Sequence, residues 1–208
     1  NLGKILLKNK NILILSDDIY EHVKFDNFKF FTIAQIKKLK DRTLTMNGVS
    51  KAYAMTGWRI GYAAGPKNII AAIRKIQSQS TSNPSSISQA AAVEALNGTQ
   101  SFIKKRAKSF CDRRNFVVNY LNSIPGITCL MPKGAFYVFP SCKGLIGKKT
   151  KIKNDTDFVQ KLLEKQNVAV VQGSAFGLDG YFRISYATSM KKLKIAMKRI
   201  KIFCESLG

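Results

Sequence analysis

Side chains capable of acid–base and nucleophilic chemistry follow two apolar runs in the first half of the chain. Ile12–Leu15 is followed closely by Asp17 and Tyr20, and the run Thr43–Val49 ends just before Lys51. Open α/β sheets bind ligands at the carboxyl ends of their strands, so these side chains are expected to share one sheet edge. A carboxylate there could hold a proton, and an amine could act as nucleophile or base.

Two arginines could add anion binding to this set. Arg59 lies eight residues after Lys51, and Arg183 lies near the end of the chain. A guanidinium group presents paired donors that match a phosphate or a carboxylate. Taken singly, each residue is better explained structurally, because Asp17 can cap a turn and the cations can be ordinary surface residues.

The elements that would position these residues alternate between strand and helix. Hydrophobic patterns predict strands at 12–15, 43–49 and 58–64, the end of a helix within 1–10, a short helix at 33–40, helices at 67–78 and 88–96, and a long helix over 99–121. Beyond residue 125 they predict short strands at 127–131, 135–139, 168–171 and 181–186, with helices at 155–166 and 189–205.

This order predicts an α/β protein with two domains. Residues 1–98 are expected to form part of a large three-layer domain with a mostly parallel sheet, residues 99–124 a connecting helix, and residues 125–208 a small α+β domain. Because 45% of the residues are hydrophobic, the chain can build a core and is not a disordered tail. No apolar run reaches the roughly 18 residues of a membrane span.

The formal net charge of +23 raises the question of nucleic-acid binding, because lysines gain affinity by releasing counterions from phosphates. The lysines are spread along the whole chain beside Ile and Asn, without a dense basic run flanked by stacking aromatic residues. This pattern indicates solvated surface lysines, such as the codon bias of an AT-rich genome produces. It disfavours nucleic acid as a partner.

The cysteines give no sign of a disulfide framework or a metal site. Cys111, Cys129, Cys142 and Cys204 are scattered and form no C-x-x-C pair, so we expect free thiols in a reducing cytoplasm. The first residue is Asn1 and not Met, and no leader sequence is evident. We therefore expect that the chain starts inside a longer reading frame or has been processed.

Three segments carry a resemblance to a known family. Residues 47–62, NGVSKAYAMTGWRIGY, resemble the lysine motif of the class I aminotransferases, the fold-type I family of aspartate aminotransferase. Residues 16–22, SDDIYEH, resemble the motif that precedes it, and residues 181–188, YFRISYAT, resemble the carboxylate-binding segment near the family's C-terminus. Order and separation also agree, so the chain resembles the C-terminal half of such an enzyme.

The resemblance implies pyridoxal 5'-phosphate as the cofactor and assigns a role to each matched residue. Lys51 would bind the cofactor aldehyde through its amine and then move the substrate proton as a base. Asp17 would keep the cofactor's ring nitrogen protonated, and Tyr20 would donate a hydrogen bond to its phenolic oxygen. Arg59 would bind the cofactor phosphate, with weaker support from Ser50.

The same resemblance implies the substrate class. Arg183 matches the arginine that binds the substrate's α-carboxylate, and the reaction would be amino transfer between an amino acid and a 2-oxo acid. Aspartate with 2-oxoglutarate is favoured because GWRIGY resembles the bacterial aspartate group, while aromatic, prephenate and alanine substrates remain open. Gly48 stands where some relatives have a phosphate-binding hydroxyl, and His22 is interpreted as a packing residue. Residues 134–137 and 170–177 resemble small-domain elements and are interpreted first as core and turn.

Intact members of the family are roughly twice this length and form homodimers. Their earlier half supplies a Gly-rich phosphate turn, an aromatic ring on the cofactor and further contacts, and its strands would cover apolar edges that are otherwise exposed. Three hypotheses follow. The chain is an aminotransferase in truncated or split form, an inactive remnant or scaffold, or, ranked last, a basic protein that interacts with nucleic acid.

Overall fold

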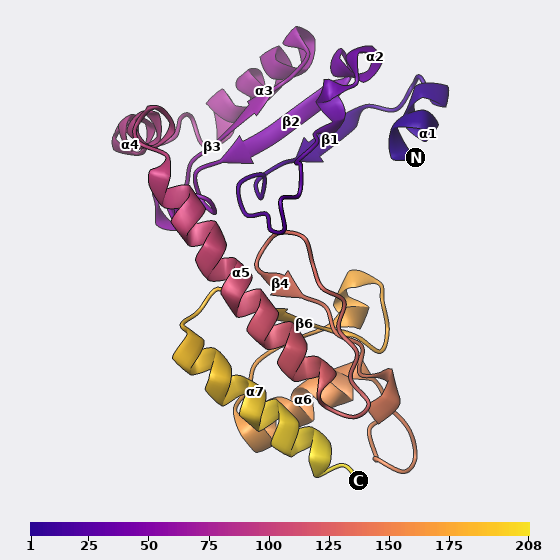
Figure 1. Ribbon diagram of the computed structural model, residues 1–208. Coiled ribbons are helices and arrows are strands. Elements are labelled where there is room, and N and C mark those ends of the chain that lie inside the picture. The colour runs from indigo at the N-terminus through magenta and orange to yellow at the C-terminus, as the bar shows by residue number, and fades with distance from the viewer. The chain divides into compact units, whose positions relative to one another are not determined.

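The computed structural model describes residues 1–208 (Figure 1). The chain divides into two compact units, Asn1–Ala107 and Lys108–Gly208. The long helix α5 (Ser101–Asn122) contributes residues to both units. Each unit contains both helices and strands, so the chain has the predicted α/β character.

The first unit contains a three-stranded sheet in the order β1-β2-β3. Strand β1 (Ile14–Asp17) runs parallel to β2 (Thr43–Gly48), and β3 (Gly61–Ala64) runs antiparallel to β2. The prediction of a mostly parallel sheet therefore holds for one of these two strand pairs and is wrong for the other. The segment between β2 and β3 forms turns and a short 3-10 helix, Thr56–Trp58, without the crossover helix that parallel strands commonly use.

Helices α1 (Leu2–Lys8), α2 (Lys37–Lys40), α3 (Lys67–Ser80) and α4 (Ser86–Asn97) accompany this sheet. Helix α3 follows Pro66, a residue that fits a helix start but not its interior. Helix α4 is rich in alanine, the strongest helix former, and ends before Gly98. The expected short helix at 33–40 is a 3-10 turn, Ile33–Gln35, followed by α2.

A small apolar core in the first unit lies around the segment that carries Lys51. Its buried members are Val49, Ala52, Tyr53 and Ala92. The cluster joins the end of β2 to helix α4, so the backbone on both sides of Lys51 is anchored by apolar burial.

The second unit contains an antiparallel sheet in the order β4-β6-β5. Its strands are β4 (Tyr137–Val138), β5 (Val171–Gln172) and β6 (Phe182–Ser185), and its helices are α6 (Asp155–Gln166) and α7 (Met190–Glu205). Phe158, Phe182 and Phe203 are fully buried, and the Phe158 ring centroid lies 5.0 Å from that of Phe182 and 5.3 Å from that of Phe203. These rings join α6, α7 and β6 into one core.

The strand expected at 127–131 does not form. Only Thr128 makes an isolated bridge, to Ser141. At Cys129 the side chain of Asn122 takes the place of a strand neighbour, because it accepts from the Cys129 N–H at 2.7 Å and donates to the Cys129 carbonyl at 3.0 Å. A single asparagine thus satisfies the backbone groups that a partner strand would otherwise bind. The strand expected at 168–171 is reduced to β5.

No helix is long and apolar enough to cross a membrane.

Candidate functional site

Five of the six predicted site residues lie at one edge of the sheet in the first unit. They are Asp17, Tyr20, Ser50, Lys51 and Arg59. Asp17, the last residue of β1, pairs with Met46, and Gly48 at the end of β2 pairs with Gly61 at the start of β3. Tyr20, Ser50, Lys51 and Arg59 lie in the segments that directly follow β1, follow β2 and precede β3. An acid, a phenol, a hydroxyl, an amine and a guanidinium therefore lie at one edge of the sheet, at the carboxyl ends of β1 and β2 and just before the start of β3.

Two adjacent acids at the end of β1 differ in their environment. Asp18 is buried, and its carboxylate accepts a hydrogen bond from the Ser16 hydroxyl at 2.8 Å. Asp17 is exposed, and its Oδ1 accepts only a longer bond of 3.3 Å from the Ile19 N–H. The Asp17 carboxylate is thus the member of the pair that is accessible to a ligand.

The turn after β1 holds Tyr20 in place through its backbone. The Glu21 N–H donates to the Asp18 carbonyl, and the Val23 N–H donates to the Tyr20 carbonyl, both at 2.9 Å. Val23 is buried and anchors the end of this turn, while Tyr20 is half-buried. The phenol is therefore carried by an ordered turn.

The segment around Lys51 is held by buried neighbours and by its own turn. Val49 and Ala52 are buried, and the Ala54 N–H donates to the Lys51 carbonyl at 3.2 Å. The Thr56 hydroxyl donates to the Ser50 carbonyl at 3.1 Å. Lys51 itself is half-buried, so its amine is carried by a fixed backbone at the edge of the core.

Arg59 lies in a strained backbone position before β3. Its φ of 50° places it in the left-handed region, which non-glycine residues rarely adopt. Its Nη1 donates to the Thr56 carbonyl at 3.0 Å, and the side chain is exposed. This bond uses one guanidinium nitrogen and leaves further guanidinium donors available for an anion.

The close packing of β2 against β3 explains why position 48 is a glycine, and the sequence alone did not show this. A Cβ added at Gly48 would lie 3.1 Å from the Gly61 Cα and 3.2 Å from the Ile60 carbonyl oxygen. The two glycines thus let β2 and β3 approach closely next to the Lys51 segment.

A polar bridge that sequence analysis missed joins the two loops of this edge. The Asn47 side-chain amide donates to Glu21 Oε1 at 2.8 Å, and His22 Nε2 lies 3.2 Å from the same oxygen. Asn47 Oδ1 also accepts from the Gly48 N–H at 2.8 Å. Glu21 and His22 stand inside the recognised motif, but only the strand register reveals that they reach Asn47.

Tyr53 extends this bridge toward the following helix. Its ring lies edge-on to His22 with centroids 6.3 Å apart, and its hydroxyl donates to Gln100 Oε1 at 2.9 Å. Burial and then the negative charge of Glu21 raise the pKa of Tyr53, so the phenol stays protonated as the donor. His22 thus contacts the Tyr53 ring and the Glu21 carboxylate, and its interpretation as a packing residue stays a prediction.

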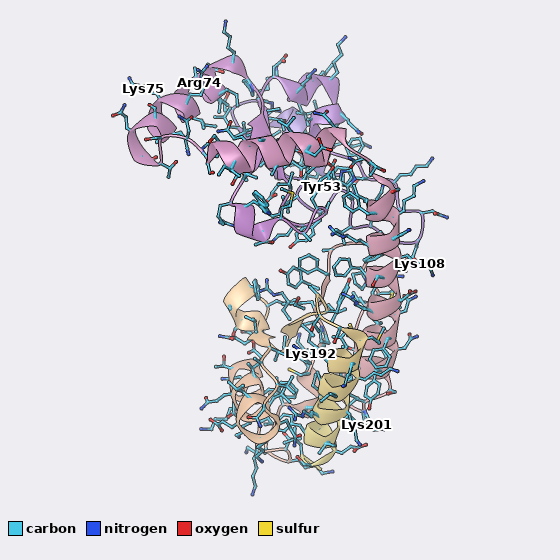
Figure 2. All side chains as sticks on the ribbon, turned by 90° about the vertical axis from the view of Figure 1, so that its left-hand side faces the viewer. Tyr53, Arg74, Lys75, Lys108, Lys192 and Lys201 are labelled. Carbon is cyan, nitrogen blue, oxygen red and sulfur yellow. The ribbon has the colours of Figure 1, made fainter.

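An open cavity of about 950 Å³ lies against the sheet and α3. Asp17 lines it together with Tyr62, Arg74 and Lys75, and Figure 2 labels these two cations on α3. Lys51, Tyr20, Ser50 and Arg59 are not among its lining residues. In the first unit, five of the predicted residues thus lie at the same edge of the sheet. Among these five, only Asp17 also lines the cavity.

Arg183 lies in the second unit, on β6, where two aromatic rings enclose its guanidinium. Its Cζ lies 4.7 Å from the Tyr137 ring centroid and 4.5 Å from the Phe176 ring centroid. Both rings belong to the segments 134–137 and 170–177, which resemble small-domain elements that face the cleft and were interpreted first as core and turn. They fix the plane of the guanidinium by cation–π contact, which is the role that sequence analysis missed.

A family model and individual relatives both match the chain, and both are aminotransferases. Residues 1–200 match the family of class I and II aminotransferases. An aspartate aminotransferase of Rhizobium meliloti strain 1021 is 57% identical over 212 residues, which cover 100% of this chain and 52% of the relative. A probable aspartate/prephenate aminotransferase of Rickettsia typhi is also 57% identical over 212 residues, covering 100% of this chain and 53% of the relative.

Solved structures agree with these relatives. The crystal structure of the Rhizobium meliloti aspartate aminotransferase gives a TM-score of 0.95 at 57% identity and covers 98% of this chain and 52% of that chain. The Thermus thermophilus aspartate aminotransferase with maleate gives 0.87 at 35% identity, covering 97% of this chain and 50% of that chain. The chain belongs to the class I and II aminotransferase family, whose members depend on pyridoxal phosphate. It spans about half the length of the curated relatives it matches.

Proposed function

We propose that this chain supplies the later half of a pyridoxal-phosphate-dependent aminotransferase. The observation that carries the proposal is the single sheet edge that gathers Asp17, Lys51 and Arg59 from three neighbouring segments. The order of the three sequence motifs supports the assignment to the later half of the family's pattern.

The chemistry of these side chains fits the cofactor's three reactive features. An amine suits an aldehyde, a carboxylate suits a protonated ring nitrogen, and a guanidinium suits a phosphate. Asp17 is the exposed acid of its pair, and the exposed Arg59 retains donors beyond its bond to Thr56. When bound, pyridoxal phosphate supplies an aldehyde carbon that accepts amines and a ring that stores the electron pair released at the substrate's Cα.

Each residue at the edge then has a defined task. The Lys51 Nζ would hold the cofactor through its aldehyde and would act as the base that takes the proton from the substrate's Cα. The Asp17 carboxylate keeps a proton on the ring nitrogen, and the Tyr20 hydroxyl donates toward the phenolic oxygen. Arg59 binds the phosphate, and the Ser50 hydroxyl adds a weaker contact.

Arg183 would bind the α-carboxylate of the substrate. A guanidinium with a fixed plane can present two parallel N–H donors to a carboxylate, and the Tyr137 and Phe176 rings supply this constraint. All α-amino acids share that carboxylate, so Arg183 selects the substrate class. We infer aspartate and 2-oxoglutarate as the substrate pair, supported by the relatives named aspartate aminotransferase.

We further infer how the chain is organised and where it acts. Residues 1–98 would belong to the large cofactor-binding domain, 99–124 to the connecting helix and 125–208 to the small C-terminal domain. The full-length chain would form a homodimer. The four free cysteines support a cytoplasmic setting.

A spectroscopic titration tests the proposal. Adding about one equivalent of pyridoxal phosphate to the chain is expected to produce a visible absorption band that Lys51→Ala weakens strongly and that Lys67→Ala, at an exposed position of α3, retains. Absence of the band from the chain both alone and with a complementing half would favour the inactive remnant. Salt-sensitive binding to duplex DNA without the band would favour the basic interaction protein.

A further inference from the structure

The turn before β4 contains a strained backbone position. Ala135 has a φ of 61°, in the left-handed region that residues other than glycine rarely adopt. Such a conformation costs free energy and persists only where the surrounding structure holds it. Tyr137, whose ring contacts Arg183, lies two residues further along the chain. The groups that hold Ala135 therefore also help to place the Tyr137 ring.

Tyr186 holds this turn from the core of the second unit. Its hydroxyl donates to the Ala135 carbonyl and its N–H donates to the Phe136 carbonyl, both at 2.9 Å. Tyr186 is fully buried, and burial raises its pKa, so the phenol stays protonated as the donor. The buried Arg114 adds a third bond, from its Nη1 to the Pro132 carbonyl at 2.8 Å. Three carbonyls of this segment thus accept hydrogen bonds from buried residues.

The side chains of Tyr186 and Arg183 point to opposite sides of the sheet. Phe182, Ile184 and Tyr186 are buried, whereas Arg183 and Ser185 are not, and this alternation is that of an extended strand. The Tyr186 hydroxyl therefore acts on Arg183 through the backbone of the turn and not by direct contact.

The path from the turn to Arg183 is short. Strands β4 and β6 are neighbours (Figure 1), and Tyr137 on β4 pairs with Ser185 on β6. The Tyr137 ring is one of the two aromatic walls around the Arg183 guanidinium. If the backbone at Ala135 relaxed from its left-handed conformation, the start of β4 would rotate and carry this ring with it.

We propose that Tyr186 is a positioning residue for Arg183. By holding Ala135 in its strained conformation, the Tyr186 hydroxyl fixes the Tyr137 ring and with it the plane in which Arg183 presents its donors to an α-carboxylate. A ring that only filled the core would serve as well without its hydroxyl. This inference rests on the proposed function, because that function assigns the α-carboxylate to Arg183.

The test uses the chain assembled with its complementing half, which is the part of the Rhizobium meliloti enzyme that this chain does not match, expressed as a separate fragment. After addition of pyridoxal phosphate, spectral titrations give the affinities for aspartate and for β-alanine, which is aspartate without its α-carboxylate. Tyr186→Phe removes one buried hydrogen bond, so it should weaken aspartate binding roughly three- to tenfold and change β-alanine binding by less than about twofold. Tyr120→Phe, at a half-buried position of α5, is the matched control and should change neither affinity.

A second variant tests the strain directly. Glycine adopts the left-handed conformation without a steric penalty, so Ala135→Gly in the Tyr186→Phe background should restore aspartate affinity to within about threefold of the unmodified assembly. The same double variant serves if Tyr186→Phe alone does not fold. An independent readout is the nitrogen-15 NMR signal of the Arg183 Nε–H group, which Tyr186→Phe should broaden and Tyr120→Phe should leave unchanged.

Equal losses for aspartate and β-alanine, an unchanged affinity for aspartate, or no rescue by Ala135→Gly would overturn the proposal. An unmodified assembly that binds neither pyridoxal phosphate nor aspartate would contradict the proposed function instead. In that case the Arg183 signal decides the positioning role, because a signal broadened by Tyr186→Phe supports it and an unchanged signal contradicts it.

Discussion

Arg183 shows how aromatic rings can hold a guanidinium group. Tyr137 and Phe176 enclose its guanidinium from β4 and from the 3-10 turn Gly173–Phe176. A stacked guanidinium retains its in-plane donors, because cation–π contact uses the face of the group and not its N–H bonds. The residue can therefore be held by aromatic rings and still bind a carboxylate.

Replacing Arg183 with lysine keeps the charge but removes the planar pair of donors. We expect Arg183→Lys to weaken binding of aspartate by roughly 10- to 100-fold while leaving the absorption band of bound pyridoxal phosphate unchanged. The measurement is a titration of the chain, assembled with its complementing half, that follows the spectral change caused by aspartate. Arg199→Lys, at an exposed position of α7, is the matched control. Equal affinities for both variants would contradict the assignment.

The Glu21 carboxylate joins the loop after β1 to the end of β2 through Asn47. Hydrogen bonds to charged, partly exposed groups contribute modestly, so Glu21→Ala is expected to lower the free energy of unfolding by roughly 1 kcal/mol. It should also speed hydrogen exchange in the loop that follows β1. Glu94→Ala, at an exposed position of α4, should change neither quantity beyond about 0.5 kcal/mol. Urea denaturation and hydrogen exchange provide the check.

At the scale of elements, helix α6 has a fully formed N-terminal cap. The Asn154 side chain accepts from the Asp157 N–H at 2.9 Å, and Asp157 Oδ2 accepts from the Lys153 N–H at 2.9 Å. Lys161 Nζ lies 2.9 Å from the same Asp157 oxygen. Reciprocal bonds of this kind satisfy backbone donors that a helix start otherwise leaves open.

The Lys153 N–H and the Lys161 ammonium lower the pKa of Asp157 below its usual value. A depressed folded-state pKa adds stability that is present above the ordinary aspartate pKa of about 3.9 and is lost as pH falls through the lower folded value. Asp157→Ala should therefore cost about 1 kcal/mol at neutral pH and less at pH 3. Thermal unfolding at both pH values tests this. An equal cost at both would contradict the cap.

Patterns of hydrophobic residues predicted most helices of the chain, because helical spacing persists over many residues. The long helix expected at 99–121 is α5, and the helix expected at 155–166 is α6. Short strands were less predictable. The 127–131 strand failed because the Asn122 side chain binds the Cys129 backbone, and this contact depends on how the end of α5 packs.

Sequence patterns predicted the part of the candidate site that lies at the ends of strands. They did not predict the contacts between side chains of different segments. Asp17 and Lys51 follow apolar runs, and parallel strands bring such ends to one edge. The bridge from Asn47 to Glu21 and the contact of Tyr137 with Arg183 join residues that are distant in sequence. Nothing in their spacing specifies those contacts.

At the scale of the whole chain, three buried thiols are expected to make the second unit sensitive to alkali. Burial raises the pKa of Cys129 to about 11 and those of Cys142 and Cys204 to about 12. Thiols of the unfolded chain ionise near pH 8.5, so between that pH and the folded values the unfolded state binds fewer protons and stability falls as pH rises.

The loss should be on the order of 1 kcal/mol for each thiol and pH unit in that range. Urea denaturation followed by circular dichroism at pH 8 and at pH 10.5 measures it. Cys142→Ala should make the dependence on pH shallower, while Cys111→Ala, at a half-buried position, should alter it less. A stability that does not change between the two pH values would contradict this account of the core.

We propose that Lys51 holds pyridoxal phosphate, although many other lysines of the chain compete for any aldehyde. The direct measurement treats the chain, alone and with its complementing half, with about one equivalent of pyridoxal phosphate, reduces the product with borohydride and maps the label by peptide mass spectrometry. We predict that Lys51 carries most of the label and that Lys51→Ala abolishes this selectivity. Label spread evenly over the exposed lysines in both preparations, with no preference for Lys51, would contradict the claim.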